Sequence, residues 1–220
     1  MSRISFFRAP ASSIVPYKDI SLVDIYHYIT GPYAAERTAK LRSIDDKKVK
    51  GIFKRTKFDY VTFSGTFTRR TDADLVAHSG YLCLDFDHLD DAGNLTAARS
   101  VLLQDPHFET LLLFTSPSGN GLKWVIPINL EQCDHRTWFN AVRNYLAATY
   151  HLDADPACVN VSRSCFLPHD PDCYIAPRLL PELSALDAEL AGTAGTEGAL
   201  TDLATKLCAT NIKIENNEQQ

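Results

Sequence analysis

The sequence feature that most constrains the fold is the segment YLCLDFDH, residues 81–88, in which an apolar, strand-forming run carries two aspartates. Side chains two positions apart lie on the same face of a strand. Alternate residues from Leu82 to Phe86 are therefore expected to face a core, while Asp85 and Asp87 share the opposite, solvent-facing side. Two neighbouring carboxylates repel each other unless a divalent cation lies between them. The pattern predicts a site for Mg²⁺ or Mn²⁺; its alternative is a solvated strand end.

The other predicted elements follow a mixed order, which favours an α+β fold. The first fifty or so residues are rich in helix-forming side chains and are predicted to be helical. The chain then changes to β-branched and aromatic residues, and a turn-forming stretch at 116–121 predicts a hairpin. We expect helices over 21–30, 33–44, 45–55, 95–103 and 134–149, and strands over 58–67, 81–88, 110–116, 122–128 and 162–168.

The bulk properties are those of an ordinary globular chain, and 220 residues suffice for one large domain or a domain with a small appendage. We expect a domain over residues 1–178, with a helical part (1–57) and a sheet unit (58–178), followed by a tail or linker (179–220). No apolar stretch is long enough to span a bilayer and no signal-peptide pattern is present, so we expect a cytoplasmic protein with no membrane partner. The six cysteines contain no C-x-x-C pair and are expected to be reduced.

The turn SPSGNG and the strand after it form a second candidate element. Backbone N–H groups of a tight turn can cradle a phosphate, which makes Ser118, Gly119 and Gly121 candidate nucleotide-binding residues. Lys123 alternates with apolar neighbours, so it is expected on the same sheet face as the aspartates, as a point-charge phosphate ligand. The alternative is an ordinary hairpin with one exposed lysine.

A basic stretch offers a candidate nucleic-acid interface, although the net charge of −5 argues against a chain that is basic all over. A run of lysines and arginines on one segment can follow a phosphate backbone, and it can equally be a solvated helix face. The candidate residues are Lys47, Lys48, Lys50, Lys54, Arg55, Lys57 and Arg70.

The segment DADPACVNVSRSCFLPHDP supplies the remaining candidates. Asp155 or Asp170 can provide a third carboxylate, and Arg163 a guanidinium for phosphate. Both aspartates precede prolines, so each is also a candidate turn initiator. A zinc site through Cys158, Cys165, His169 and Cys173 is a weaker alternative, because the spacing matches no common zinc ribbon.

The order of the D-x-D strand, the SPSGNG turn and the later acidic segment resembles that of the archaeo-eukaryotic primase (prim-pol) superfamily. More narrowly, it resembles the VirE N-terminal domain of mobile-element and phage-like helicase–primase proteins. The matching segments are YLCLDFD, SPSGNGLK, in which Lys123 stands where the superfamily has histidine, and the stretch from Asp155 to Arg163. SGTF, residues 64–67, with Arg70 is similar to a further family element. The similarity covers residues 50–177.

The resemblance implies an RRM-like antiparallel or mixed sheet that carries the D-x-D strand, beside an N-terminal helical and β unit. It also implies two Mg²⁺ or Mn²⁺ ions held by Asp85, Asp87 and Asp155, with Asp170 as a competing ligand. The implied function is a DNA primase or polymerase of a mobile-element replication protein, with single-stranded DNA and nucleoside triphosphates as partners and a helicase domain or protein as a further one.

Three other functions fit the same residues. Lys123 in place of histidine suits a catalytically degenerate module that only binds nucleic acid or nucleotide. A D-x-D pair with a further acid also suits a metal-dependent nuclease, although the strand region 58–67 has no glutamate of the kind a topoisomerase-type site requires. The third is a structural interaction domain.

Overall fold

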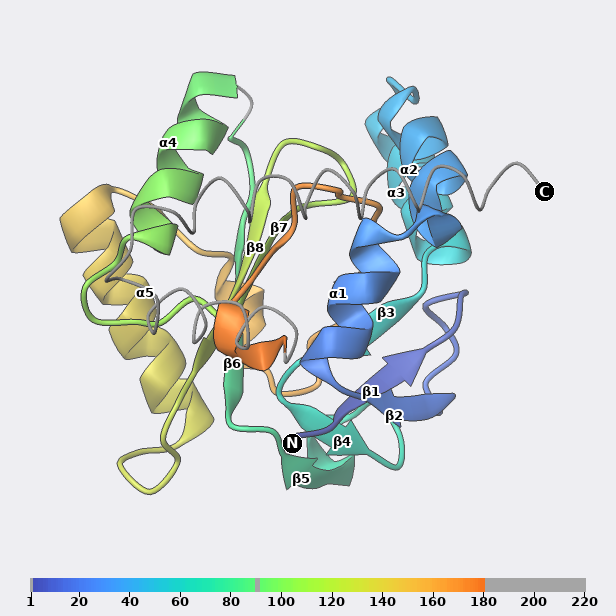
Figure 1. The fold of residues 1–220 in the computed structure, drawn as a ribbon. Coiled ribbons are helices and arrows are strands. Elements are labelled where there is room, and N and C mark those ends of the chain that lie inside the picture. Colours follow the sequence, from blue (N-terminus) through green and yellow to red (C-terminus); the bar gives the residue numbers. More distant parts are fainter. Residues whose placement is uncertain (1, 90–91, 181–220) are drawn as a thin grey trace, which may run out of the picture. The chain divides into compact units, whose positions relative to one another are not determined.

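The computed structural model of the chain describes residues 2–89 and 92–180. The chain divides into two compact units, residues 1–176 and 177–220. The strands and α-helices given below belong to the first unit, and the described part of the second contains the short 3-10 helix η4 (Pro177–Leu179). The predicted α+β architecture is confirmed, with antiparallel pairing in each sheet (Figure 1).

The first sheet is built from strands that lie far apart in the sequence. Strand β1 (Ile4–Phe7) pairs with β2 (Lys18–Ile20) and with β3 (Tyr60–Thr62), and β3 pairs with β9 (Cys165–Phe166). All four side chains of β1 are buried. The prediction that the first fifty residues are helical is therefore wrong for β1 and β2, because burial between partner strands decides their conformation more than local propensity does.

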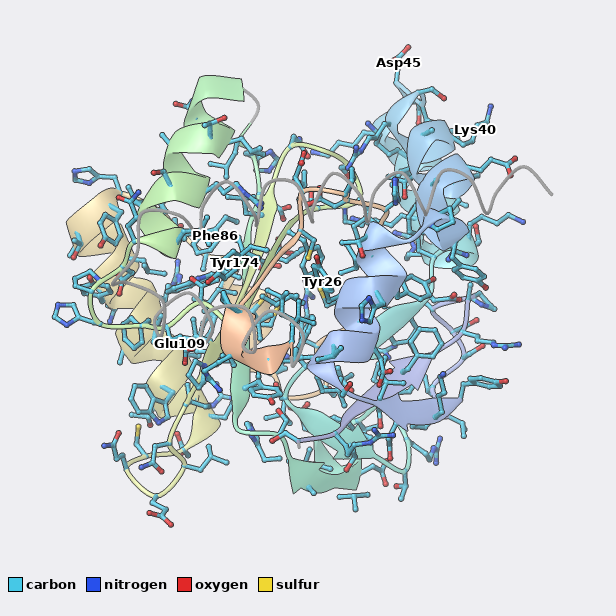
Figure 2. All side chains as sticks on the ribbon, in the orientation of Figure 1. Tyr26, Lys40, Asp45, Phe86, Glu109 and Tyr174 are labelled. Atoms are coloured by element: carbon cyan, nitrogen blue, oxygen red, sulfur yellow. The ribbon has the colours of Figure 1, made fainter. Side chains whose placement is uncertain are left out.

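Three helices precede β3 in the chain. The first begins at a capping box, in which the side chains of Ser21 and Asp24 each accept the other's backbone N–H. Asp46 caps the third helix, none of whose side chains is fully buried. Lys40 and Asp45 project outward from this region (Figure 2). The helices are α1 (Leu22–Thr30), α2 (Ala35–Arg42) and α3 (Lys47–Lys57), with the 3-10 helix η1 (Pro32–Ala34) between the first two.

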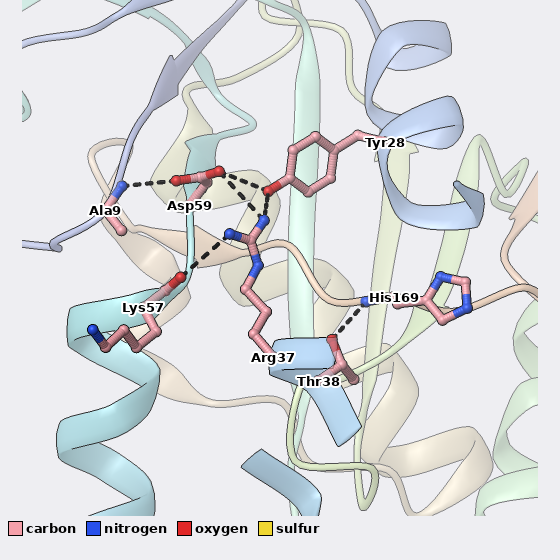
Figure 3. Close-up of polar contacts among 7 residues, drawn as sticks. All are labelled: Ala9, Tyr28, Arg37, Thr38, Lys57, Asp59 and His169. Carbon is pink, nitrogen blue, oxygen red and sulfur yellow. Dashed lines mark hydrogen bonds and ion pairs between the residues drawn. The ribbon is translucent and has the colours of Figure 1, made fainter. Parts of the chain in front are cut away.

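A buried ion pair connects these helices to the start of β3 (Figure 3). Asp59 is 4% exposed and accepts the Ala9 N–H at 2.8 Å and the Tyr28 hydroxyl at 2.7 Å. Arg37 Nη2 lies 3.4 Å from the oxygen that Tyr28 contacts, and it also donates to the Tyr28 hydroxyl. Arg37 Nη1 donates to the carbonyl oxygen of Lys57 at 3.4 Å. The network holds α1, α2 and the end of α3 against the first sheet.

The second sheet carries the D-x-D strand. In spatial order its strands are β10 (Tyr174–Ile175), β7 (Leu112–Thr115), β8 (Leu122–Pro127) and β6 (Tyr81–Phe86). Since β8 is antiparallel to both neighbours, β6 and β7 run in the same direction on either side of it. This is a split β-α-β unit, whose connecting helix is α4 (Ala92–Leu103).

Two smaller groups of elements complete the first unit. Strands β4 and β5 form a separate two-stranded sheet, so the predicted strand over 58–67 divides between two sheets at its Ser64-Gly65 turn. Asp134 caps the helix that follows β8, as the helical spacing of its apolar residues predicts. The elements are β4 (Gly65–Phe67), η2 (Asp72–Asp74), β5 (Leu75–His78), α5 (His135–Tyr150) and η3 (Pro156–Val159).

Helices α4 and α5 cover one face of the second sheet (Figure 1). Phe86 lies on this covered side (Figure 2). Alternate residues of β6 and β8 pack there against the helices: Leu82, Leu84 and Phe86 from β6, and Leu122, Trp124 and Ile126 from β8. The intervening residues face the opposite way, toward the first sheet, where the rings of Phe63 and Phe114 lie 6.4 Å apart. Among the described helices, none combines the length and apolar character needed to cross a bilayer.

Candidate functional site

Asp85 and Lys123 form a cross-strand pair on the face of the second sheet opposite α4 and α5. The two residues are direct partners in the register of β6 and β8. Their side chains form an ion pair between Asp85 Oδ2 and Lys123 Nζ, and the residues are only 8% and 9% exposed. Asp85 is thus buried, and not solvent-facing as the sequence predicts. The expectation that Lys123 shares a sheet face with Asp85 is confirmed by the register.

The second oxygen of Asp85 is an unusual acceptor. Asp85 Oδ1 is buried and has no hydrogen-bond partner among residues 2–89 and 92–180. Side-chain ligand atoms of Asp85, Asp155 and Cys158 lie within 4.8 Å of one another. The backbone supports this approach, since the Asp155 N–H donates to the Asp85 carbonyl oxygen at 2.8 Å. An unsatisfied buried carboxylate oxygen beside a second carboxylate is suited to a cation.

Asp155 has two further partners. One carboxylate oxygen accepts the Ala157 N–H at 2.9 Å and caps η3, and the other lies 2.6 Å from Arg163 Nη2. The proline after Asp155 opens this 3-10 turn, so Asp155 initiates a turn while its carboxylate also lies near that of Asp85. Each carboxylate oxygen has two lone pairs and can accept a second interaction. The structure therefore brings Asp85, Asp155, Lys123 and Arg163 together.

Two of the three donor groups, the carboxylates of Asp85 and Asp155, fit a hard divalent ion. Mg²⁺ and Mn²⁺ prefer oxygen ligands, which Asp85 and Asp155 supply, whereas a thiol suits softer metals. Burial raises the pKa of the Cys158 thiol to about 11. The zinc alternative finds no support within the described residues, where the only such group is Asp85, Asp155 and Cys158. His169 is engaged elsewhere, since its Nδ1 contacts the Gly31 carbonyl oxygen at 2.9 Å.

A cavity of about 640 Å³ opens beside the two aspartates of the D-x-D strand. Its charged lining is five basic and two acidic side chains, a balance that suits a polyanion. Residues of both sheets and of α3 contribute to it. The lining residues are Pro10, Ala11, Ser12, Lys54, Arg55, Thr56, Arg70, Asp85, Asp87, Ser116, Pro117, Ser118, Lys123, Arg163, Ser164 and Phe166.

Asp87 lines this cavity but does not belong to the group of possible metal ligands around Asp85. Strand β6 ends at Phe86, and His88 adopts a left-handed backbone conformation with φ of 64°. The alternation that would place Asp87 beside Asp85 therefore stops one residue too early. Asp87 is exposed and also lines a neighbouring cavity.

Two backbone amides of the turn at 116–121 form hydrogen bonds within the turn. The Gly119 N–H donates to the Ser116 carbonyl oxygen at 2.9 Å, and the Ser116 N–H donates to the Gly121 carbonyl oxygen at 2.8 Å. These amides close the turn and are not available to a phosphate. Gly121 packs so closely on β6 that a Cβ there would lie 2.4 Å from the Phe86 carbonyl oxygen. Ser118 lines the cavity. Ser116 was not singled out in the sequence, and its buried hydroxyl has no hydrogen-bond partner in the described part of the chain.

The basic residues of α3 divide between different surfaces. Lys54 and Arg55 line the main cavity, and burial lowers the pKa of Lys54, as does the nearby Lys123 ammonium. Lys50 and Lys47, about one and two helical turns before Lys54, line the neighbouring cavity of about 450 Å³ together with Lys54, Asp87 and Ser118. The two cavities therefore share lining residues along one face of α3.

Three other predicted residues have different surroundings. Lys57 lines a separate open cavity with Arg37, and Lys48 is exposed. Asp170 is 5% exposed; its Oδ2 accepts the Thr115 N–H at 2.6 Å and its Oδ1 the Asp172 N–H at 3.2 Å. Asp170 thus stabilises the end of β7 and lies outside the group of possible metal ligands.

Arg70 and Arg42 donate hydrogen bonds to backbone carbonyl groups of residues that line the cavity. Arg70 lines the cavity and donates to the Tyr60 hydroxyl at 3.1 Å and to the Ala11 carbonyl oxygen at 3.3 Å. Arg42, which sequence patterns did not single out, donates from α2 to the carbonyl oxygens of Ser116 and Pro117 at 3.5 and 3.4 Å. Contacts separated by about seventy-five residues in the chain leave no local signal by which Arg42 could have been found.

Comparison with known proteins corrects the family expected from the motifs. The family model described as "BT4734-like, N-terminal domain" matches residues 53–175. No curated protein and no solved structure matches the chain. The predicted membership of the prim-pol superfamily and of the VirE N-terminal group is wrong, because the matching model belongs to a different family and the shared motif order was short and permissive. The matched segment covers more than half of the 220 residues, and the chain belongs to the BT4734-like N-terminal domain family.

Proposed function

We propose that the cavity binds a nucleoside triphosphate and that the domain catalyses metal-dependent nucleotidyl transfer on a single-stranded DNA template. The observation that carries this proposal is Asp85 Oδ1, which is buried and has no hydrogen-bond partner within residues 2–89 and 92–180. Asp85 lines a predominantly basic cavity and lies close to Asp155. A carboxylate pair beside a group of cations is the combination that phosphoryl-transfer sites require.

The positions of the residues in the cavity give each a different proposed role. Asp85 and Asp155 would hold Mg²⁺ or Mn²⁺, which supplies charge neutralisation at the reacting phosphate when bound. Lys54 and Arg55 line the same cavity from α3, and Arg70 lines it from the segment that follows β4, where all three suit the triphosphate. Arg163 is more exposed and is free to exchange Asp155 for a phosphate oxygen.

The neighbouring cavity supports a template path. Lys47 and Lys50 line it, and it shares Lys54, Asp87 and Ser118 with the main cavity. Backbone phosphates of a single strand would follow these lysines without sequence preference. The chain order β6, α4, β7, β8, α5, β10 is that of an RRM-like unit, although β10 pairs with β7 and not with β6.

A second function is favoured by one specific observation. Both candidate metal ligands already have a cationic side-chain partner, Lys123 for Asp85 and Arg163 for Asp155. Internal neutralisation of this kind suits a module that binds nucleotide or DNA without catalysis.

Template-dependent extension with labelled nucleotides and Mn²⁺ tests the proposal. The wild-type chain is expected to extend a primed single strand, and Asp85→Asn and Asp155→Asn to lose at least about a hundredfold in rate. Asp153→Asn is the matched control, because that exposed aspartate pairs with Arg143 away from the cavity. Absence of product with intact nucleotide and DNA binding would establish the binding module instead. Nicking of DNA with metal but without nucleotides would indicate a nuclease.

A further inference from the structure

We propose that the Lys123 ammonium permanently occupies the place of one cation, so that the centre binds a single divalent ion through Asp85 Oδ1 and Asp155. The use of this ion in catalysis rests on the nucleotidyl transfer proposed above. The number of divalent ions bound per chain is a property of the protein alone and can be measured without substrate.

The position of Lys123 makes its ammonium a fixed part of the centre. Lys123 lies on β8, which pairs on both sides, with β6 and with β7. The residue is 9% exposed, and its Nζ contacts Asp85 Oδ2 on the adjacent strand. A lysine on a central strand, buried and in direct register with its partner, has little freedom to leave it. One oxygen of Asp85 is therefore already neutralised.

The other oxygen of Asp85 marks where an ion would bind. Asp85 Oδ1 is buried without a hydrogen-bond partner in the described part of the chain, on a residue that is more than nine-tenths buried and lines the cavity. Asp155 offers its carboxylate within the same 4.8 Å group. The Ser116 hydroxyl, also buried and unpartnered there, lines the same cavity.

Within the described residues, a second ion has no comparable position. In two-metal sites the ions lie about 3.5–4 Å apart, and a shared carboxylate commonly gives one oxygen to each. Asp85 cannot do so, because its Oδ2 already contacts the Lys123 ammonium. An additional divalent ion at that oxygen would be repelled by the ammonium at close range. Asp87 lines the cavity but lies outside the ligand group.

The test is the number of Mn²⁺ ions bound by the full chain, measured by electron paramagnetic resonance titration and counted as the difference from Asp85→Asn. One ion is expected for the wild type. Lys123→Met is expected to bind two ions, or one ion at least tenfold more tightly because both Asp85 oxygens become available. Lys123→Arg retains the positive charge and is expected to keep one ion at similar affinity. Lys48→Met, an exposed lysine on α3, is the matched control and is expected to behave as wild type.

Several results would overturn the single-ion centre: two ions or none on the wild type, or a Lys123→Met variant that is folded by circular dichroism and binds Mn²⁺ as the wild type does. If Lys123→Met does not fold, the number of Mn²⁺ ions bound by the wild type and by Lys123→Arg still tests the single-ion centre. Two ions together with template extension would reject the single-ion centre and leave the proposed nucleotidyl transfer intact. One ion without template extension would reject nucleotidyl transfer and leave the single-ion centre intact.

Discussion

Removal of the Asp59 carboxylate is expected to cost the domain much of its stability. Asp59 is 4% exposed and accepts two hydrogen bonds, from Ala9 and Tyr28, in addition to its ion pair with Arg37. Burial and the Asp59 carboxylate raise the pKa of the Tyr28 hydroxyl, which therefore remains a neutral donor. Breaking a buried ion pair by removing one partner typically costs about 3–5 kcal/mol. Since domains are stable by only about 5–15 kcal/mol, Asp59→Ala should come close to unfolding this one.

Urea unfolding of the full chain, followed by far-ultraviolet circular dichroism, measures the effect. Asp59→Ala should lower the free energy of unfolding by about 3–5 kcal/mol. Asp59→Asn should cost less, because its amide oxygen can still accept from one of the two donors. The matched control is Asp153→Ala, which removes an exposed ion pair with Arg143 and should cost under about 1 kcal/mol.

A double-mutant cycle separates the ion pair from the other contacts. Asp59→Ala combined with Arg37→Met should cost at least about 1 kcal/mol less than the sum of the two single changes, because Arg37 then no longer remains as an unpaired buried charge. A loss below about 1 kcal/mol for Asp59→Ala, with no coupling to Arg37, would refute the stabilising role of the network in Figure 3.

Two further predictions concern pH and DNA binding. Burial, and to a smaller extent the adjacent His78, lower the pKa of His135 from 6.5 to about 4. Between pH 6.5 and pH 4 the unfolded chain therefore binds a proton at this residue that the folded chain does not bind. The free energy of unfolding should fall by up to about 3 kcal/mol from pH 7 to pH 4. His135→Gln should flatten this dependence in urea unfolding at the two pH values and the exposed His107→Gln should not; an unchanged slope in His135→Gln would contradict the assignment. Lys47→Ala with Lys50→Ala should weaken single-stranded DNA binding in fluorescence anisotropy and reduce the slope of log K against log salt by about 1.4, that is about 0.7 per lost phosphate contact. Lys48→Ala should leave the slope unchanged, and an equal effect of Lys48→Ala would show that only general charge matters.

Strands β6, β7 and β8 of the second sheet could be predicted because they follow simple patterns, whereas the short β10 was not predicted. Alternation along β6 separated Leu82 and Leu84 from Asp85, and the polar residue among apolar neighbours placed Lys123 on the same face. The spacing of apolar residues also identified α5 and its start at Asp134. In these elements the face on which a residue lies follows from its immediate neighbours in the sequence, whereas the burial of Asp85 does not.

The parts that could not be predicted depend on partners distant in the chain. The four residues of β1 become a strand because β2 and β3 enclose them. The direct pairing of Asp85 with Lys123 depends on β6 lying beside β8 across the intervening α4 and β7, which no local pattern specifies. The motif order suggested the wrong family for a related reason, since short motifs fix neither the strand order nor the contacts between them.

The direct register between β6 and β8 has an evolutionary consequence. Lys123 faces Asp85, whereas the next residue, Trp124, fills the core on the opposite face. Inserting or deleting one residue in β8 would exchange the two, sending an ammonium into the core and an indole into the cavity. Selection can therefore replace individual side chains of this centre, but it cannot change the length of the strand without losing the fold, so homologues should vary here by substitution alone.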